Sequence, residues 1–206
     1  MPEELGTIFL GVGLGIGLAA ACGFRVFVPL LVAGAAAKAG LLPISLAEGF
    51  EWLATWPAII TLGAATVLEL AAYYIPWLDN LLDTISTPAA IIAGVLAAAA
   101  CVTEMDPLLK WTVAAIVGGG SAGIVKAGMV GLRALSTTIT GGVGNVVVAT
   151  FEWLVALALS VFAVVAPIFA GILGLAIVVF LTRFAYRCCR KLFGPREPAA
   201  STAENA

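Results

Sequence analysis

The chain has 206 residues, of which 62% are hydrophobic and only 11% are charged, and its mean hydropathy is +1.13. Soluble domains carry roughly 25% charged residues, so this chain cannot cover itself with polar surface, and its main partner is expected to be the lipid bilayer. The net charge of −2 says nothing about partners, but the lack of a basic stripe leaves nucleic acid without an electrostatic footprint, so we expect no nucleic-acid binding.

Histidine is absent from the sequence, and this removes the commonest metal ligand and the usual general base at neutral pH. Ser121 therefore has no histidine with which to form a serine triad. We expect no enzymatic activity, no bound metal and no cofactor, and we turn to the membrane spans for candidate sites.

The first apolar run, Leu5 to Phe24, carries no charge and is long enough to cross a bilayer. The residues before it lack the basic n-region of a signal peptide, so we expect the run to be retained. Small residues four positions apart favour close helix packing in lipid. Two such pairs occur here, formed by Gly11 with Gly15 and by Gly13 with Gly17.

A second apolar run, Val26 to Ala37, follows Arg25 directly and ends before Lys38. Two spans joined by a tight turn near Gly23 are one interpretation of this region. A re-entrant hairpin that enters and leaves on the same side of the membrane is the other. Arg25 lies at the tip of the hairpin in both cases.

The third span is predicted from Phe50 to Tyr74, with tryptophan and tyrosine residues at its two ends. Aromatic side chains of this kind settle at the two membrane interfaces. A helix of this length would extend about 37 Å and reach both interfaces. Glu69 lies inside this span, where a carboxylate needs a partner.

The connector Pro76 to Pro88 is predicted as a short helix, and a small Ala-rich span, Ala89 to Thr103, follows it. Asp79 and Asp83 are four residues apart and share one face of that helix. With Glu69 they form a candidate cation site. Helix capping and a solvated helix face are the simpler interpretation, which we favour because histidine is absent.

The segment Leu109 to Arg133 is apolar enough to cross a bilayer, but Gly118, Gly119 and Gly120 interrupt it. Because glycine weakens a helix by about 1 kcal/mol per residue, the sequence predicts a helix break here. Lys126 lies just beyond the glycines. The segment also fits a dinucleotide-binding glycine pattern, but that pattern needs a strand before it, so a kink or a packing groove is the better interpretation.

Two further spans are predicted, Val146 to Ala166 and Ile168 to Thr182, folded against each other at Pro167. A polar, Gly-rich turn, Ser136 to Asn145, precedes them. A basic segment follows, which contains Arg183, Arg187, Arg190, Lys191 and Arg196.

Basic residues near span ends mark the cytoplasmic side of a membrane. The basic segment therefore predicts a cytoplasmic C-terminus, and a count of about seven spans predicts an N-terminus on the opposite side. We expect an all-α, polytopic helical bundle over residues 1–192, a disordered cytoplasmic tail over 193–206, and a location in the bacterial inner membrane.

A short internal repeat relates the two halves of the chain. The tetrapeptide that begins at Phe50 recurs at Phe151, 101 residues later, and the same offset aligns Arg25 with Lys126. The repeats would cover residues 5–75 and 106–176. In the seven-span topology the two copies begin on opposite sides, which is typical of inverted-repeat transporters with a site at the membrane midplane. Coincidence between apolar segments is the alternative.

Several motifs together are similar to those of one known family. They are the run from Ala19 to Gly40, the P-W-L-D-x-x-x-D connector that ends in Thr-Pro, and the K-A-G-M-V-G-L-R motif with its Gly-Asn turn. In this respect the chain resembles bacterial integral membrane proteins that are defined only as a domain of unknown function, the DUF4126 family. The resemblance covers nearly the whole chain and supports the membrane assignment, and it implies no activity.

The charged residues inside spans are the candidates for a polar site in the membrane, since such residues are expensive there and usually functional. They are Lys126, Arg25, Glu69, Arg133 and Glu152. Lys126 and Arg25 are expected either to attract an anion or to pair with Glu69 or Glu152. Lys126 is expected to be buried, with one of these two carboxylates as its partner. A small transporter or channel for an ion or small solute is the leading hypothesis. A membrane scaffold or assembly factor, which would form a homo-oligomer through its Gly-rich helices, is the alternative, with these charges serving as structural ion pairs.

Overall fold

The computed structural model describes residues 2–72, 76–103 and 105–193, with side chains described at 5–72, 85–103, 105–188 and 190. These residues form helices and connecting loops, without a strand, which confirms the predicted all-α class. Apart from Phe193, the predicted tail 193–206 lies outside the described residues.

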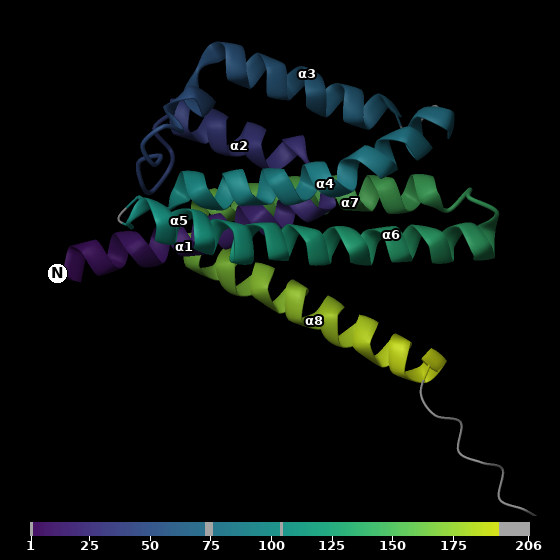
Figure 1. Ribbon diagram of the computed structural model, residues 1–206. Coiled ribbons are helices and arrows are strands. Elements are labelled where there is room, and N and C mark those ends of the chain that lie inside the picture. Colours follow the sequence, from purple (N-terminus) through teal and green to yellow (C-terminus); the bar gives the residue numbers. More distant parts are fainter. Residues whose placement is uncertain (1, 73–75, 104, 194–206) are drawn as a thin grey trace, which may run out of the picture.

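The helices pack around α1, which contacts α2, α4, α6, α7 and α8. Helices α2 and α3 lie together on one side of this bundle, and α8 diverges from it on the other side (Figure 1). In chain order the elements are α1 Pro2–Phe24, α2 Phe27–Lys38, the 3-10 turn η1 Glu51–Ala54, α3 Trp56–Ala72, α4 Pro76–Cys101, α5 Pro107–Val113, the π-helical segment η2 Ala114–Gly119, α6 Gly120–Thr140, α7 Asn145–Val165 and α8 Pro167–Phe193.

Four segments are long and apolar enough to cross a membrane on their own: Leu5–Phe24, Pro107–Thr140, Asn145–Val165 and Pro167–Cys188. Three shorter apolar helices accompany them: Phe27–Lys38, Trp56–Ala72 and Ile85–Cys101. The chain is therefore a membrane protein with several membrane-embedded helices. Among the residues whose side chains are described, four of these seven apolar segments have the length of a full span.

The first hairpin does not consist of two full spans, because its first leg has the length of a span and its second leg does not. Helix α1 ends at Phe24, and α2 has only 12 residues, which is about 18 Å of helix against a hydrocarbon core about 30 Å thick. Figure 1 shows α2 turning back beside α1 toward the end of the bundle where α1 begins. The hairpin tip, with Arg25, is thus placed between helices.

The expected single helix from Phe50 to Tyr74 is wrong. The segment begins as the short turn η1, and Thr55 is extended, with ψ 149°. The α-helix starts afresh at Trp56, where the Thr55 hydroxyl accepts the Ala58 N–H at 3.4 Å. Pro57 stands in the first turn, where its missing N–H costs nothing. The resulting helix α3 has 17 residues, about 25 Å, and does not reach both interfaces.

The predicted connector and the Ala-rich span that follows it are not separate elements. They form one helix, α4, with Pro88 in its interior. Asp79 and Asp83 belong to the first half of this helix, and their side chains lie outside the described residues. The candidate cation site at these two positions is therefore not located by the structure.

The glycine triplet does not break the helix, contrary to expectation. Residues from Pro107 to Thr140 form one continuous helical segment that widens to a π-helix at Ala114–Gly119. The first two glycines instead give close packing on α4. A Cβ at Gly118 would lie 2.6 Å from the Ala98 Cβ, whereas a Cβ at Gly120 would meet nothing within 4 Å. The packing-groove interpretation accounts for Gly118 and Gly119.

The last three long helices follow the predicted order, with α6 extending further than expected into the Gly-rich turn. Helix α6 ends at Gly141, whose φ of 63° is left-handed and suits glycine. Helices α7 and α8 are separated by Ala166 alone, and Pro167 opens α8. The fold between these two helices at Pro167 is confirmed.

The two predicted small-residue pairs of α1 face different neighbours. Gly11 and Gly15 pack on α4, at the Cys101 carbonyl and at Ala98, whereas Gly13 and Gly17 pack on the start of α8. A Cβ at Gly13 would lie 2.7 Å from the Pro167 carbonyl oxygen. These glycines are used between helices of the same chain, so their packing does not itself require a second copy.

Lys38 and Lys110 lie at the same end of the bundle, close to aromatic residues around η1. The Lys38 ammonium is 5.0 Å from the centre of the Trp56 ring, and the Lys110 ammonium is 5.0 Å from that of Phe50. Phe50 also contacts Trp111, with ring centres 6.1 Å apart. In Figure 1 the N-terminal end of α1 and the described end of α8 lie at opposite ends of the bundle.

The structure gives no support to an inverted relation between the two proposed repeats. Gly15 of α1 and Gly118 both pack on Ala98, and further along both helices Gly23 packs on Val125. Helices α1 and α6 therefore run in the same direction, whereas an inverted repeat would place them antiparallel. The aligned pair Arg25 and Lys126 consequently lies at a similar level in the bundle.

Candidate polar site at the helix junction

All five charged residues predicted for the polar site are buried. Two serines are buried as well, and the complete set among the described residues is Arg25, Glu69, Ser121, Lys126, Arg133, Glu152 and Ser160. Buried charges require partners, because removing an ion from water costs several kcal/mol. The contacts divide the charged residues into two adjoining groups.

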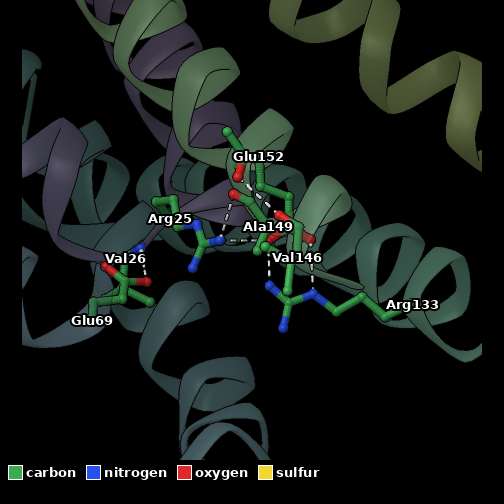
Figure 2. A network of polar contacts seen from close by, with 8 residues as sticks. Arg25, Val26, Glu69, Arg133, Val146, Ala149 and Glu152 are labelled. Carbon is green, nitrogen blue, oxygen red and sulfur yellow. Dashed lines mark hydrogen bonds and ion pairs between the residues drawn. The ribbon is translucent and has the colours of Figure 1, made fainter. Parts of the chain in front are cut away.

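The first group joins Arg25 to Glu152. Arg25 follows the last residue of α1, and its side chain is only 1% exposed. Its Nη2 atom lies 3.1 Å from Glu152 Oε2 and donates to the Ala149 carbonyl oxygen at 2.8 Å. Glu152 and Ala149 lie on adjacent turns of α7 (Figure 2). The tip of the first hairpin is thereby tied to α7.

Arg133 of α6 binds the same carboxylate from the other side. Its Nε donates to Glu152 Oε1 at 3.0 Å and its Nη2 to Glu152 Oε2 at 2.6 Å. This is the two-point geometry that a planar guanidinium and a carboxylate favour. We call Arg25, Arg133 and Glu152 the ion-pair cluster; it connects the α1–α2 junction, α6 and α7 (Figure 2).

The second group centres on Glu69 of α3. Its Oε1 accepts the Val26 N–H at 3.3 Å, and the Phe27 N–H also points toward this carboxyl group. These N–H groups belong to the beginning of α2, where backbone donors have no partner within the helix. Glu69 Oε2 has no hydrogen-bond partner among the described residues. Glu69 therefore caps α2 from a distant position in the sequence.

Two cations act on the Glu69 carboxyl group. Arg25 interacts with it most strongly, and Lys126 contributes as well. Lys126 is 4% exposed, so the prediction that it is buried is confirmed. Of its two predicted acidic partners, Glu69 interacts with it electrostatically, whereas the described contacts of Glu152 go to Arg25 and Arg133.

The two copies of the repeated tetrapeptide have different environments. Glu51 of the first copy lies in η1, is exposed, and accepts the Gly49 N–H at 2.9 Å. Glu152 of the second copy is 1% exposed and holds two arginines. The same tetrapeptide thus forms a surface turn in one half of the chain, whereas in the other half its glutamate is the centre of a buried cluster.

Sequence reasoning missed the backbone groups that complete the site. The Val26 N–H and the Ala149 carbonyl carry no signal in the sequence, because every residue has such groups. Ser160 was also missed; its hydroxyl donates to the Ala156 carbonyl at 2.6 Å within α7, which satisfies it locally.

The surface hollows lie away from the charged groups. One is lined by Thr7, Ala37, Ile44 and Glu51 at the far end of α2, and the other is an apolar groove between α7 and α8 that includes Phe151. Neither of these two hollows is lined by Lys126 or Glu69. Because all five charged residues are buried, the described conformation keeps them closed to solvent.

The site offers charge and hydrogen-bond donors rather than a nucleophile with its base. Among the described residues, no three His, Cys, Asp or Glu side chains gather in a way that could hold a metal ion. The sequence model of one family, described as "Domain of unknown function (DUF4126)", matches residues 12–187. No curated protein matches the chain, and no solved structure matches it.

Proposed function

Since the chain belongs to the DUF4126 family, whose description assigns no activity, we propose from the geometry that it is a small transporter or channel for an ion or a small solute. The proposal includes no catalytic step. We further propose that it resides in a bacterial inner membrane with its C-terminus in the cytoplasm, on the basis of the basic residues that follow the last span.

One observation carries the transport proposal: a helix hairpin ends between the membrane helices, and charged groups gather at its tip. Arg25 lies at the junction of α1 and α2, and Glu69 binds the first N–H groups of α2. Interrupted helices whose ends carry charges within the membrane are typical of solute sites in transporters. Lys126 adds a third charge at the same place.

Opening of the site needs a part that can move, and α3 is the best candidate. Of the residues in this helix only Glu69 and Ala72 are buried, and Leu62 packs half-buried against the core, so α3 is a peripheral helix of the bundle. Because Glu69 itself closes the end of α2, a displacement of α3 would uncover the N–H groups and the two cations together. We propose that α3 acts as the gate.

A scaffold function is the second candidate, and the ion-pair cluster favours it. Arg25 and Glu152 are each 1% exposed, and their contacts are short and direct. Such a dry network stabilises a helix arrangement without any solute. The two functions differ in one respect, since transport requires that water and solute reach the charged groups in some conformation.

The test is a flux assay with the purified protein in liposomes, using a panel of sodium, potassium, chloride, formate and glycerol. We expect the wild type to move at least one of them faster than empty liposomes, and Lys126→Met to abolish that flux while eluting as a folded protein. Lys38→Met is the matched control, because Lys38 is exposed and lies against Trp56. Background flux of the folded wild type for the whole panel would contradict transport and leave the scaffold function.

A further inference from the structure

The beginning of α2 is a helix N-terminus without a cap from its own sequence neighbourhood. Helix α2 has 12 residues, and its N-cap residue, Val26, makes no side-chain capping bond. The positive end of a helix with unpaired N–H groups is a favourable place for an anion. Here the Val26 N–H is directed at the carboxylate of Glu69, which comes from 43 residues further along the chain.

The carboxylate that fills this place is incompletely satisfied. Glu69 is 8% exposed, and its Oε2 lacks a hydrogen-bond partner among the described residues. A buried polar atom left without a partner is destabilising, because it has lost its hydrogen bonds to water. Such a group in a native structure calls for an explanation other than stability.

Several groups oppose the cost of burying this carboxylate. Burial is the largest effect and disfavours its charge, whereas Arg25, the Val26 and Phe27 N–H groups and Lys126 favour it. The carboxylate is also carried by α3, in which only Ala72 is buried besides Glu69. The helix end and the cations thus belong to the body of the bundle, whereas the anion that they hold belongs to a peripheral helix.

We propose that the N-terminus of α2 is a binding site for a small monovalent anion, and that the Glu69 carboxylate occupies it in the closed conformation as an internal substitute for that anion. A free anion binds to the Val26 and Phe27 N–H groups when α3 moves away. The inference rests on the proposed transport function, because it names the solute class as an anion of carboxylate or halide size.

The first experiment measures binding without transport. Purified Glu69→Ala is heated in detergent with sodium formate, sodium chloride or sodium gluconate at equal concentration. We expect formate or chloride at ten times its Kd to raise the unfolding temperature of Glu69→Ala by roughly 3–6 °C above the gluconate value. Gluconate carries the same charge but is too large for a place filled by one side-chain carboxylate. A shift with formate alone assigns a carboxylate, and a shift with chloride assigns a halide.

Two proteins serve as controls. The wild type should show a much smaller shift, because its own carboxylate fills the site. Glu51→Ala removes an exposed carboxylate that also accepts a backbone N–H, at 2.9 Å, and should behave like the wild type. Equal shifts for Glu69→Ala, Glu51→Ala and the wild type would overturn the inference.

A second variant covers the case in which Glu69→Ala does not fold. Glu69→Gln removes the charge at the same side-chain size, and a smaller anion-dependent shift is expected from it. A folded Glu69→Gln without any such shift would also overturn the inference.

Flux in liposomes separates this inference from the proposed function. Formate or chloride flux that increases severalfold in Glu69→Ala supports both. An anion-dependent shift without flux of any solute supports the anion site and contradicts transport. Flux of a cation or of glycerol by the wild type, without an anion response in Glu69→Ala, supports transport and overturns the anion site.

Discussion

Replacing Glu152 with glutamine is predicted to be the most damaging single change in the ion-pair cluster. Glu152 accepts two hydrogen bonds from Arg133, at 3.0 and 2.6 Å, and pairs with Arg25 at 3.1 Å. In Glu152→Gln the amide keeps one acceptor oxygen and turns an NH₂ group toward a guanidinium. Two buried cations then face each other without the carboxylate between them.

The expected loss follows from the burial of the partners. Breaking a buried ion pair by removing one member costs about 3–5 kcal/mol, because the other charge stays buried. Glu152 serves two arginines, so the upper end of this range applies. For a chain of this size about 1 kcal/mol changes the unfolding temperature by roughly 2–4 °C, which gives a predicted decrease of roughly 10–20 °C.

The assay is thermal unfolding in detergent, with the remaining folded fraction measured by size exclusion after heating. Glu51→Gln is the matched control, because Glu51 stands in the same tetrapeptide, Phe-Glu-Trp-Leu, and is exposed. Its predicted change is within about 0.5 kcal/mol. Equal, small shifts for Glu152→Gln and Glu51→Gln would refute the assignment of Glu152 as the centre of a buried cluster.

Three further predictions can be measured in the same preparations or in cells. Arg133→Met should lower the unfolding temperature less than Glu152→Gln, since Arg25 still neutralises Glu152; the reverse order would mean that Arg25 contributes nothing. Gly13→Leu should cost about 3 kcal/mol or more, because a Cβ would lie 2.7 Å from a carbonyl oxygen of α8, whereas Gly120→Leu, with nothing within 4 Å, should have little effect. Reporter fusions should place the C-terminus in the cytoplasm and the N-terminus outside, and two cytoplasmic ends would contradict the topology.

The packing of α1 could be read from its sequence because it depends on residue size alone. Glycines four residues apart lie on one helix face, and two offset pairs define two faces. The pair Gly11 and Gly15 packs on α4, and the pair Gly13 and Gly17 packs on α8. The sequence could not name these partners, because many helices in the chain offer small residues.

The length of α3 could not be read from hydropathy. The apolar run continues through Phe50, yet Thr55 and Pro57 favour a new helix start between the two tryptophans. A Thr-x-Pro segment is a recognisable signal for the start of a helix. It was overlooked because the aromatic residues at both ends suggested one helix spanning the membrane. The π-helical segment before Gly120 could not be predicted either. Its apolar residues and glycines are compatible both with a widened helical turn and with a helix break.

A pairing of Arg25 with Glu69 or Glu152 was predicted and is found with Glu152, whereas the part that Arg133 plays in it was not predicted. Charges within apolar runs identified all five residues, and all five are buried. Their partners are set by contacts that the α1–α2 junction makes with α7 and α3, which are distant in the sequence. Glu152 therefore holds Arg25 and Arg133, and Glu69 caps α2, although an alignment of repeats had suggested that Glu51 and Glu152 are equivalent.

The transport account requires that water reach the hairpin tip, and cysteine labelling measures this most directly. Val26→Cys would be introduced, with the four native cysteines replaced by alanine, beside Ala163→Cys as a control in the apolar core; the native residues are 5% and 0% exposed. A membrane-impermeant thiol reagent should label Val26→Cys in folded protein and leave Ala163→Cys unlabelled. If neither cysteine is labelled while both variants stay folded, the tip is permanently dry, and the charged groups are structural ion pairs of a scaffold.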